Sequence, residues 1–200
     1  MKQQIVSIRG THGSGKSTIV RKILDKYPHR PLLHNPTDKR PYGYEVTLSP
    51  LKRLFVVGPY HTACGGCDAV QPYADIWPMV HAAHAAGMHV LFEGALVSSS
   101  YGSIGHTMNA KQEGGSADCT FAFLDTPLST CLDRIKERRA AKGNFEPLNP
   151  LNTATKFENV ARTKDQMRKL GSRVRIADID FHKPVTGVLK LFGVTLRSEP

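Results

Sequence analysis

The sequence has 200 residues, which is enough for one α/β domain with a full core and too few for two ordinary domains joined by a linker. Hydrophobic residues make up 40% and charged residues 22%, and no apolar run is long enough to cross a bilayer, so we expect a soluble, cytoplasmic protein without a membrane partner. Lysine and arginine total 27 against 17 acidic residues, and the resulting net charge of +10 favours a polyanionic partner such as nucleic acid.

The N-terminal part of the chain alternates between strand and helix patterns. Residues 4–9 form a short β-branched run, a glycine-rich loop follows, and apolar residues recur at helical spacing over residues 17–27. Prolines then end the helix, and residues 31–34 favour a second strand. Residues 44–48 and 53–57 suit two strands separated by a turn, which predicts a hairpin on the substrate side.

The middle of the chain predicts one helix and two strands. Residues 72–86 are alanine-rich and precede a glycine, as expected of a helix and its C-terminal end, and residues 89–92 form a short apolar strand. The segment 98–115 is rich in serine and glycine, which is typical of a mobile or substrate-contacting loop. Residues 120–124 then predict another strand.

The C-terminal part predicts three helices and a last strand. A basic helix starts after Asp125-Thr-Pro and runs to about residue 141, a second helix covers residues 153–170, a strand covers 173–177, and a helix covers 185–192. Strands that alternate with helices predict one domain over residues 1–200, with a parallel sheet and helices on both faces. Ligands of such sheets bind at the carboxyl ends of the strands.

The glycine-rich loop carries the most specific motif of the chain. The segment Gly10–Ser17, GTHGSGKS, satisfies G-x-x-x-x-G-K-[ST] between a predicted strand and a predicted helix, which is the context of a phosphate-binding loop. Backbone N–H groups and the helix N-terminus would hold the phosphates of ATP, Lys16 would reach the β- and γ-phosphates, and Ser17 would bind Mg²⁺. The expected nucleotide-contacting set is Gly10, Thr11, His12, Gly13, Ser14, Gly15, Lys16, Ser17 and Thr18.

Glu93 follows a buried strand and precedes a glycine, so its carboxylate is expected beside the phosphate-binding loop. There it could hold Mg²⁺ through water, together with Ser17, or orient the acceptor of the phosphoryl group. The alternative is a solvated strand end without a chemical role.

Arg134 and Arg138 lie one turn apart on the predicted basic helix and therefore share a face. Two guanidinium groups at this spacing can grip a transferring phosphoryl group. The alternative is a solvated basic face that pairs with Asp133 and Glu137. The position of the helix directly after a strand favours the catalytic interpretation.

A kinase that acts on a hydroxyl group also needs a carboxylate near the acceptor, to orient the hydroxyl or to take its proton. The acidic residues considered are Asp38, Glu45, Asp68 and Asp75. We favour Asp38, which follows the probable second strand, and Asp68, which follows a Gly-Gly-Cys turn where the backbone can approach a ligand closely.

Four cysteines are present, and a domain of this size needs no disulfide staples, so we expect reduced thiols. Cys64 and Cys67 form a C-x-x-C pair, which is half of a zinc site. Cys119 and Cys131 are too far apart in sequence to supply the second half, and metal binding by the first pair is left open.

The glycine-rich loop, the segment Phe92-Glu93-Gly94 and the segment from Asp125-Thr-Pro-Leu to Arg138-Arg139 together resemble the P-loop kinases of the nucleotide and polynucleotide kinase group. The resemblance covers most of residues 4–192. It implies a five-stranded parallel sheet and a mobile lid, residues 128–150, that carries Arg134 and Arg138 and excludes water when it closes.

Within that group, the GTHGSGKST loop, the Cys64-Gly-Gly-Cys-Asp68 turn, the Phe-Glu-Gly element and the basic charge resemble the phage 5-hydroxymethyluridine DNA kinases. This resemblance implies ATP-dependent phosphorylation of the hydroxymethyl group of a modified uracil within DNA, a step toward hypermodified thymine. The enzyme would then act in the host cytoplasm.

Two other functions are compatible with the same residues. A kinase for free nucleotides or for polynucleotide 5′ ends would act on small acceptors or on any strand end. A DNA-binding P-loop ATPase would hydrolyse ATP in response to DNA without phosphorylating it, although the short chain and the single acid in Leu91-Phe92-Glu93-Gly94 disfavour a motor. The sequence leaves open the acceptor atom, the strandedness of a DNA substrate and the oligomeric state.

Overall fold

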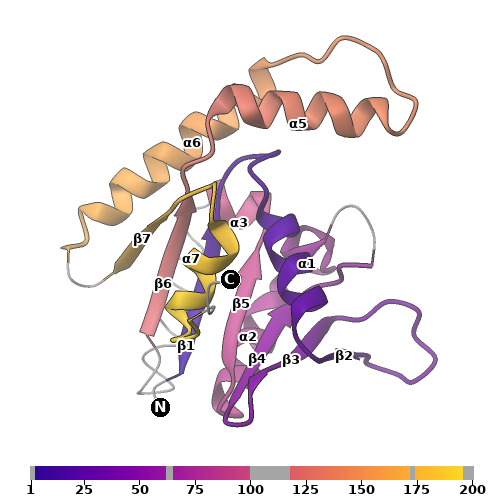
Figure 1. The fold of residues 1–200 in the computed structure, drawn as a ribbon, viewed down its shortest axis with the longest axis vertical. Coiled ribbons are helices and arrows are strands. Elements are labelled where there is room, and N and C mark those ends of the chain that lie inside the picture. The colour runs from indigo at the N-terminus through magenta and orange to yellow at the C-terminus, as the bar shows by residue number, and fades with distance from the viewer. Residues whose placement is uncertain (1–2, 62–64, 100–117, 172–173, 196–200) are drawn as a thin grey trace, which may run out of the picture.

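The computed structural model describes residues 3–61, 65–99, 118–171 and 174–195. It is an α/β fold in which helices cover both faces of a central sheet (Figure 1). The strands are β1 (Gln4–Arg9), β2 (His29–Leu32), β3 (Gly43–Ser49), β4 (Lys52–Val57), β5 (His89–Glu93), β6 (Asp118–Leu124) and β7 (Arg175–Ile179). The helices are α1 (Lys16–Lys26), α2 (Ile76–Ala85), α3 (Ala95–Ser99), α5 (Leu128–Ala140), α6 (Leu151–Arg168) and α7 (Pro184–Leu191), with 3₁₀ turns η1 (Gly66–Ala69) and η2 (Tyr73–Asp75).

The described strands form one seven-stranded sheet in the order β2-β3-β4-β5-β1-β6-β7. Neighbours from β4 to β7 pair in parallel, whereas β2 with β3 and β3 with β4 pair antiparallel. The sheet is therefore mixed: five neighbouring strands, β4, β5, β1, β6 and β7, are parallel, as in the expected five-stranded sheet, but β3 and β2 extend it in antiparallel pairing to seven strands. The reason is the tight turn between β3 and β4, because a connection of this length joins only antiparallel strands.

The strands of the sheet centre are buried on both faces, and alternate residues enter two separate cores. Val6 and Ile8 of β1 pack with Ile19, Ile23 and other apolar residues of α1 and α7 on one face. Ile5 of the same strand packs with α2 on the other face. The helical spacing of apolar residues in α1 and the period of two in β1 thus explain why the loop between them is held rigidly at the sheet edge.

A third cluster places α6 against the sheet near β6. Phe121 and Phe123 of β6 pack with Met167 of α6 and Val174. The helix α5 lies across the carboxyl ends of the parallel strands, and α6 descends from there beside β7 (Figure 1). This arrangement puts the basic helix directly above the edge where the glycine-rich loop lies.

Most predicted elements are confirmed with small shifts of their ends. The second strand starts at His29 rather than at residue 31, because it pairs with β3 from His29 opposite Val46 onward. The last strand is displaced from residues 173–177 to Arg175–Ile179, where it pairs with β6. In the serine-rich segment 98–115, Ser98 and Ser99 belong to α3, and the remainder lies outside the described residues.

Among the described residues, no helix has both the length and the apolar character needed to span a bilayer. Cys67, Cys119 and Cys131 are buried free thiols, while Cys64 lies outside the described residues.

Candidate active site

The glycine-rich loop, residues Gly10–Ser17, joins the end of β1 to the start of α1. Gly13 and Gly15 have φ of 77° and 100°, a left-handed conformation that favours glycine. A Cβ at Gly13 would in addition overlap the carbonyl oxygen of Cys131 in α5. The two glycines thus form the turn and allow the basic helix to pack directly on it.

Lys16 opens α1 and is buried beneath the loop. Its Nζ donates to the carbonyl oxygens of Gly10 and Thr11, at 2.8 and 3.0 Å. Burial lowers the pKa of Lys16, while Glu93 and Asp68 oppose that shift. The two carbonyl contacts therefore hold the amino group in place at the base of the loop.

Glu93, at the end of β5, is 2% exposed and faces the first turn of α1. Its Oε1 accepts hydrogen bonds from Ser17 Oγ at 2.8 Å and from the hydroxyl group of Tyr60 at 3.1 Å. Burial raises the pKa of Glu93, and the nearby Lys16 opposes this. The structure thus brings the carboxylate at the end of β5 to Ser17, which adjoins Lys16 in the first turn of α1.

Asp68, on η1, lies beside Glu93 and fixes the start of α3. Its carboxylate oxygens accept the backbone N–H groups of Ala95 at 2.6 Å and Leu96 at 3.1 Å. Gly94 permits this close approach, because a Cβ there would lie 3.0 Å from Asp68 Oδ1 and would push the carboxylate away. This contact explains the glycine after Glu93 in the Phe-Glu-Gly element.

Arg9 holds α3 from the other side and was not anticipated from the sequence. Its Nη1 donates to the carbonyl oxygen of Val97 at 2.5 Å, and its guanidinium lies 5.0 Å from the centre of the Phe121 ring. Burial lowers the pKa of Arg9 to about 9. The backbone N–H of Gly10 donates to Ser98 Oγ at 3.2 Å, so α3 is tied both to the glycine-rich loop and to Asp68.

Arg134 and Arg138 project from α5 toward the same loop. Arg134 Nη1 lies 3.4 Å from the carbonyl oxygens of Gly13 and Ser14. Asp133, which the sequence offered as a surface partner for the arginines, pairs with Lys136 at 3.8 Å. Both arginines line the cavity described next, as expected of groups that contact a ligand.

A cavity of about 690 Å³ lies between the glycine-rich loop, η1, α3, α5 and the loop before α7. It is lined by His12, Gly13, Ser14, Gly15, Lys16, Ser17, Thr18, Asp68, Glu93, Arg134 and Arg138 among the predicted site residues. Gly10 and Thr11 instead line a smaller cavity of about 190 Å³ behind the loop, against α6. The volume and the basic lining suit a ligand of nucleotide size that carries phosphate groups.

Asp38 is not among the residues that line this cavity. It lies in the connection between β2 and β3, where its carboxylate accepts the backbone N–H of Asn35 at 2.9 Å. Of the two carboxylates favoured from the sequence, the structure brings only Asp68 to Glu93 and the glycine-rich loop.

Several cavity residues were missed by the sequence reasoning. Arg21 and Lys22 come from α1, Lys156 comes from α6, and Phe181 and His182 come from the loop after β7. The ring centres of Phe181 and His182 are 4.0 Å apart and the ring planes are tilted by 37°, so the two rings pack against each other and form an aromatic surface at this wall. Their position after a parallel strand was the signal that could have identified them, because such loops meet at the ligand-binding edge.

The described residues contain no group of three or more His, Cys, Asp or Glu side chains that could hold a metal ion. The Ser17 hydroxyl and the Glu93 carboxylate nevertheless place two oxygen atoms 2.8 Å apart in the turn that begins with Lys16. A hard cation that keeps most of its water, as Mg²⁺ does, needs few protein ligands.

A family model and the similar proteins of known name point to the same family. The family model described as 5-hmdU DNA kinase matches residues 1–181. A 5-hmdU DNA kinase of Pseudomonas phage PaMx11 is 38% identical over 184 residues, which cover 90% of this chain and 95% of the relative. Relatives with the same name occur in Pseudomonas phage M6, with 32% identity over 85% of this chain and 88% of the relative, and in Delftia phage PhiW-14, with 30% identity over 81% and 63%.

Proposed function

The chain belongs to the 5-hmdU DNA kinase family, and on this premise we propose that it transfers the γ-phosphoryl group of ATP to the hydroxymethyl oxygen of 5-hydroxymethyluridine in DNA. The observation that carries the proposal is the meeting of the glycine-rich loop, Asp68, Glu93 and two arginines in one cavity of nucleotide size. In this interpretation the chain is a P-loop kinase, and the sheet edge is its catalytic edge.

The phosphates of ATP would lie against the glycine-rich loop. Its backbone N–H groups, the N-terminus of α1 and Lys16 supply positive charge there. The aromatic surface of Phe181 and His182 lies at another wall of the same cavity and suits the nucleobase.

Ser17 and Glu93 fit a Mg²⁺ ion, because they are oxygen ligands held 2.8 Å apart beside the lysine that contacts the phosphates. When bound, the ion would neutralise charge on the phosphate oxygens. The Tyr60 hydroxyl donates to the same oxygen of Glu93 as Ser17 does, and this second bond helps to fix the carboxylate.

The acceptor would enter on the side of η1 and α3. Asp68 orients the hydroxymethyl group there and takes its proton. The hydroxymethyl oxygen then forms a bond to the γ-phosphorus, and the bond between this phosphorus and the β,γ-bridging oxygen breaks to release ADP. We prefer Asp68 to Asp38 because Asp68 lines the cavity and Asp38 does not. Thymine has only a methyl carbon at this position and cannot react.

Arg134 and Arg138 would stabilise the charge that spreads over the transferring phosphoryl group. They come from α5, so we propose that residues 128–150 act as the lid that closes over the phosphates and excludes water. The modified base must leave the helical stack to reach this closed cavity, so single-stranded or locally open DNA should be the better substrate.

The test compares two single-stranded oligonucleotides of the same sequence, one with 5-hydroxymethyluridine and one with thymine. After incubation with ATP and Mg²⁺, the DNA is digested to nucleosides and analysed by mass spectrometry. We expect phosphate only on the modified nucleoside, and none with Lys16→Ala, which removes the charge at the base of the loop.

The other outcomes separate the alternatives. Phosphate only at 5′ ends, or only on free nucleotides, would replace the proposed acceptor and keep the kinase activity. ATP hydrolysis that DNA stimulates without any phosphorylated product would indicate a DNA-dependent ATPase.

A further inference from the structure

Four large hydrophobic side chains are strongly exposed among the described residues: Leu51, Leu96, Phe145 and Leu151. Leu96 lines the cavity. Phe145 lies in the connection between α5 and α6, and Leu151 is the first residue of α6. Only Leu51 lies elsewhere, in the turn between β3 and β4 at the opposite end of the sheet (Figure 1). The exposed apolar groups thus gather on the side of the molecule that holds the site.

Phe145 is 81% exposed although the chain around it is well tied down. Gly143, with φ of 74°, lies in the turn that follows the end of α5. Asn144 Oδ1 then accepts bonds from Arg139 Nη2 at 3.0 Å and from the backbone N–H of Glu146 at 3.1 Å. The aromatic ring is therefore held outward on an ordered turn, residues 141–150, which we term the lid turn.

The lid turn is placed between two elements of the site. The helix before it carries Arg134 and Arg138, which line the cavity. The helix after it approaches the glycine-rich loop, because Thr11 Oγ1 donates to the carbonyl oxygen of Thr153 at 3.4 Å. The lid turn does not itself line the cavity, but it continues α5 beyond Arg138, so a strand that leaves the cavity along this helix would pass the lid turn.

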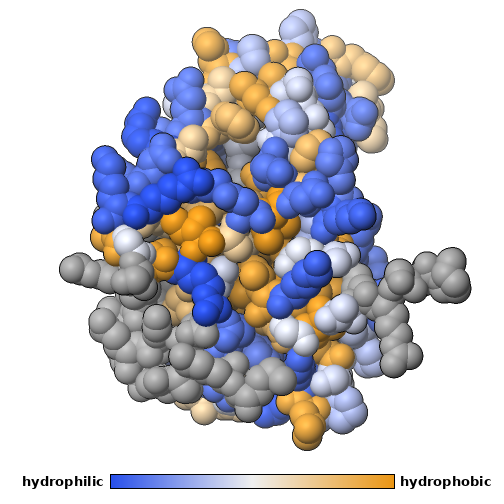
Figure 2. Space-filling model, turned by 60° about the vertical axis from the view of Figure 1, so that its left-hand side comes forward, coloured by the Kyte–Doolittle hydropathy of each residue, from blue (hydrophilic) through white to orange (hydrophobic). Residues whose placement is uncertain are grey.

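The charge around the lid turn selects the partner. Residues 128–150, which comprise α5 and the lid turn, contain five basic and three acidic side chains, and Arg139 and Lys142 precede Phe145 by six and three residues. The face that carries α6, on the left of Figure 1 and away from the lid turn, likewise shows hydrophilic side chains around exposed hydrophobic ones (Figure 2). Aromatic rings among basic side chains form the usual contact for single-stranded nucleic acid, in which bases stack on the rings and phosphates meet the cations. A basic surface around a lone ring is poorly suited to an apolar protein partner.

We propose that the lid turn is a DNA-contacting surface, in which Phe145 stacks on a base that neighbours the nucleotide being phosphorylated. This inference rests on the proposed function, since it requires a polynucleotide acceptor. When one base leaves the stack, its neighbour loses a stacking partner, and an outward aromatic ring can replace it.

The kinetic test uses Phe145→Ala with single-stranded DNA that contains 5-hydroxymethyluridine. Loss of one base-aromatic contact should raise the KM for DNA about tenfold, with kcat and the KM for ATP within about twofold of wild type. Leu51→Ala is the matched control, because it removes an equally exposed apolar side chain, 96% exposed, at the opposite end of the sheet. It should leave all three constants unchanged.

A spectroscopic test reports the stacking directly. The chain has one tryptophan, Trp77, which is buried, so Phe145→Trp introduces a second indole with a distinct exposed environment. Single-stranded DNA without ATP should quench its fluorescence, whereas Leu51→Trp should show no quenching.

An unchanged KM for Phe145→Ala together with unquenched Phe145→Trp, in an enzyme that does phosphorylate the modified DNA, would overturn this inference alone. A wild-type protein that phosphorylates free nucleotides but not DNA would instead overturn the proposed function, and the stacking inference with it.

Discussion

At the level of single residues, close backbone contacts decide how the site is assembled. Gly13 lets α5 lie against the glycine-rich loop, and Gly94 lets Asp68 approach the end of β5. These contacts bring residues that are far apart in sequence, such as Ser14 and Arg134, to within 3.4 Å. The groups that we propose to be catalytic are thus held by backbone packing as well as by their own side chains.

Replacement of either lid arginine tests whether this packing serves the chemistry. We expect Arg134→Ala and Arg138→Ala each to lower kcat by about 10²-fold, the size of other losses of transition-state charge stabilisation. Both side chains are exposed, so the thermal unfolding midpoint should change little. Steady-state phosphorylation of modified DNA measures the effect.

Lys136→Ala is the control for that experiment, because Lys136 lies between the two arginines in sequence but pairs with Asp133 on the surface. It should retain nearly full kcat. A loss below threefold in both arginine variants would return these residues to the solvated basic face.

The sequence predicted single residues well where a motif specifies its neighbours and poorly where it does not. The context of Lys16 and Ser17 was readable, because G-x-x-x-x-G-K-[ST] implies a strand before it and a helix after it. The choice between Asp38 and Asp68 was not, because each follows a plausible loop and only the fold determines which one meets Glu93. Arg9 was missed since a charged residue in a strand gives no sign that it will be buried.

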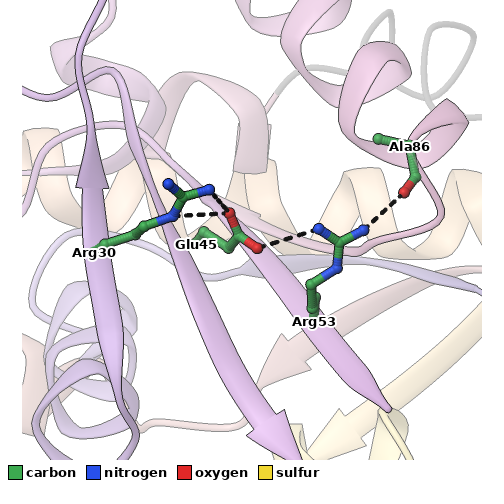
Figure 3. A network of polar contacts seen from close by, with 4 residues as sticks. All are labelled: Arg30, Glu45, Arg53 and Ala86. Carbon is green, nitrogen blue, oxygen red and sulfur yellow. Dashed lines mark hydrogen bonds and ion pairs between the residues drawn. The ribbon is translucent and has the colours of Figure 1, made fainter. Parts of the chain in front are cut away.

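At the level of elements, the antiparallel edge formed by β2, β3 and β4 is tied together by charge. Glu45 of β3 accepts from Arg30 of β2 at 3.1 and 2.6 Å and from Arg53 of β4 at 3.3 Å (Figure 3). Arg53 also donates to the carbonyl oxygen of Ala86, after the end of α2, at 3.2 Å. One carboxylate therefore links three strands, and through Arg53 a helix end.

Glu45→Gln should lower the free energy of unfolding at neutral pH by about 1 kcal/mol, because both arginines are more than half exposed and water weakens the pairs. The hydrogen bond from Arg30 is the main cause that lowers the pKa of Glu45. A lowered folded-state pKa adds stability above the unfolded value, and this stability is lost as pH falls through the folded value. The difference between variant and wild type should therefore shrink in acid.

Urea denaturation at neutral pH and below pH 4 measures this difference. Glu146→Gln is the control, because Glu146 is 84% exposed and only 3.9 Å from Arg139, so its loss should not be measurable. A Glu45→Gln variant with the same deficit at both pH values would contradict the charge explanation.

The order of helices and strands was largely predictable, because periods of two and of 3.6 residues are local signals. The strands β2 and β3, at one edge of the sheet, were predicted as strands but not as members of the central sheet. The resemblance to nucleotide kinases suggested five parallel strands, whereas pairing of β2 and β3 with the sheet depends on contacts between residues such as His29 and Val46 that no local pattern specifies.

At the level of the whole molecule, the positive charge is concentrated near the site. Residues 128–170 carry half of the net charge, and α5, which contributes to it, lies above the carboxyl edge of the sheet (Figure 1). Such a field attracts DNA before any base is recognised. The sequence predicted the sign of the partner's charge, while the location of the basic surface required the fold.

We therefore expect single-stranded DNA to bind with an affinity that falls steeply as salt rises. If the protein neutralises about five phosphates, a plot of log K against log salt has a slope of about −3.5, because each neutralised phosphate of a single strand contributes about −0.7. Lys142→Gln, in the lid turn, should reduce the slope by about one such contribution. Lys169→Gln serves as the control, because Lys169 is exposed just beyond the other end of α6, about 24 Å along the helix from Thr153. Fluorescence anisotropy at several salt concentrations gives the three slopes. A wild-type slope near zero would show that this charge does not serve DNA binding. Equal effects of the two lysine variants would show that the lid turn is not the DNA-binding surface.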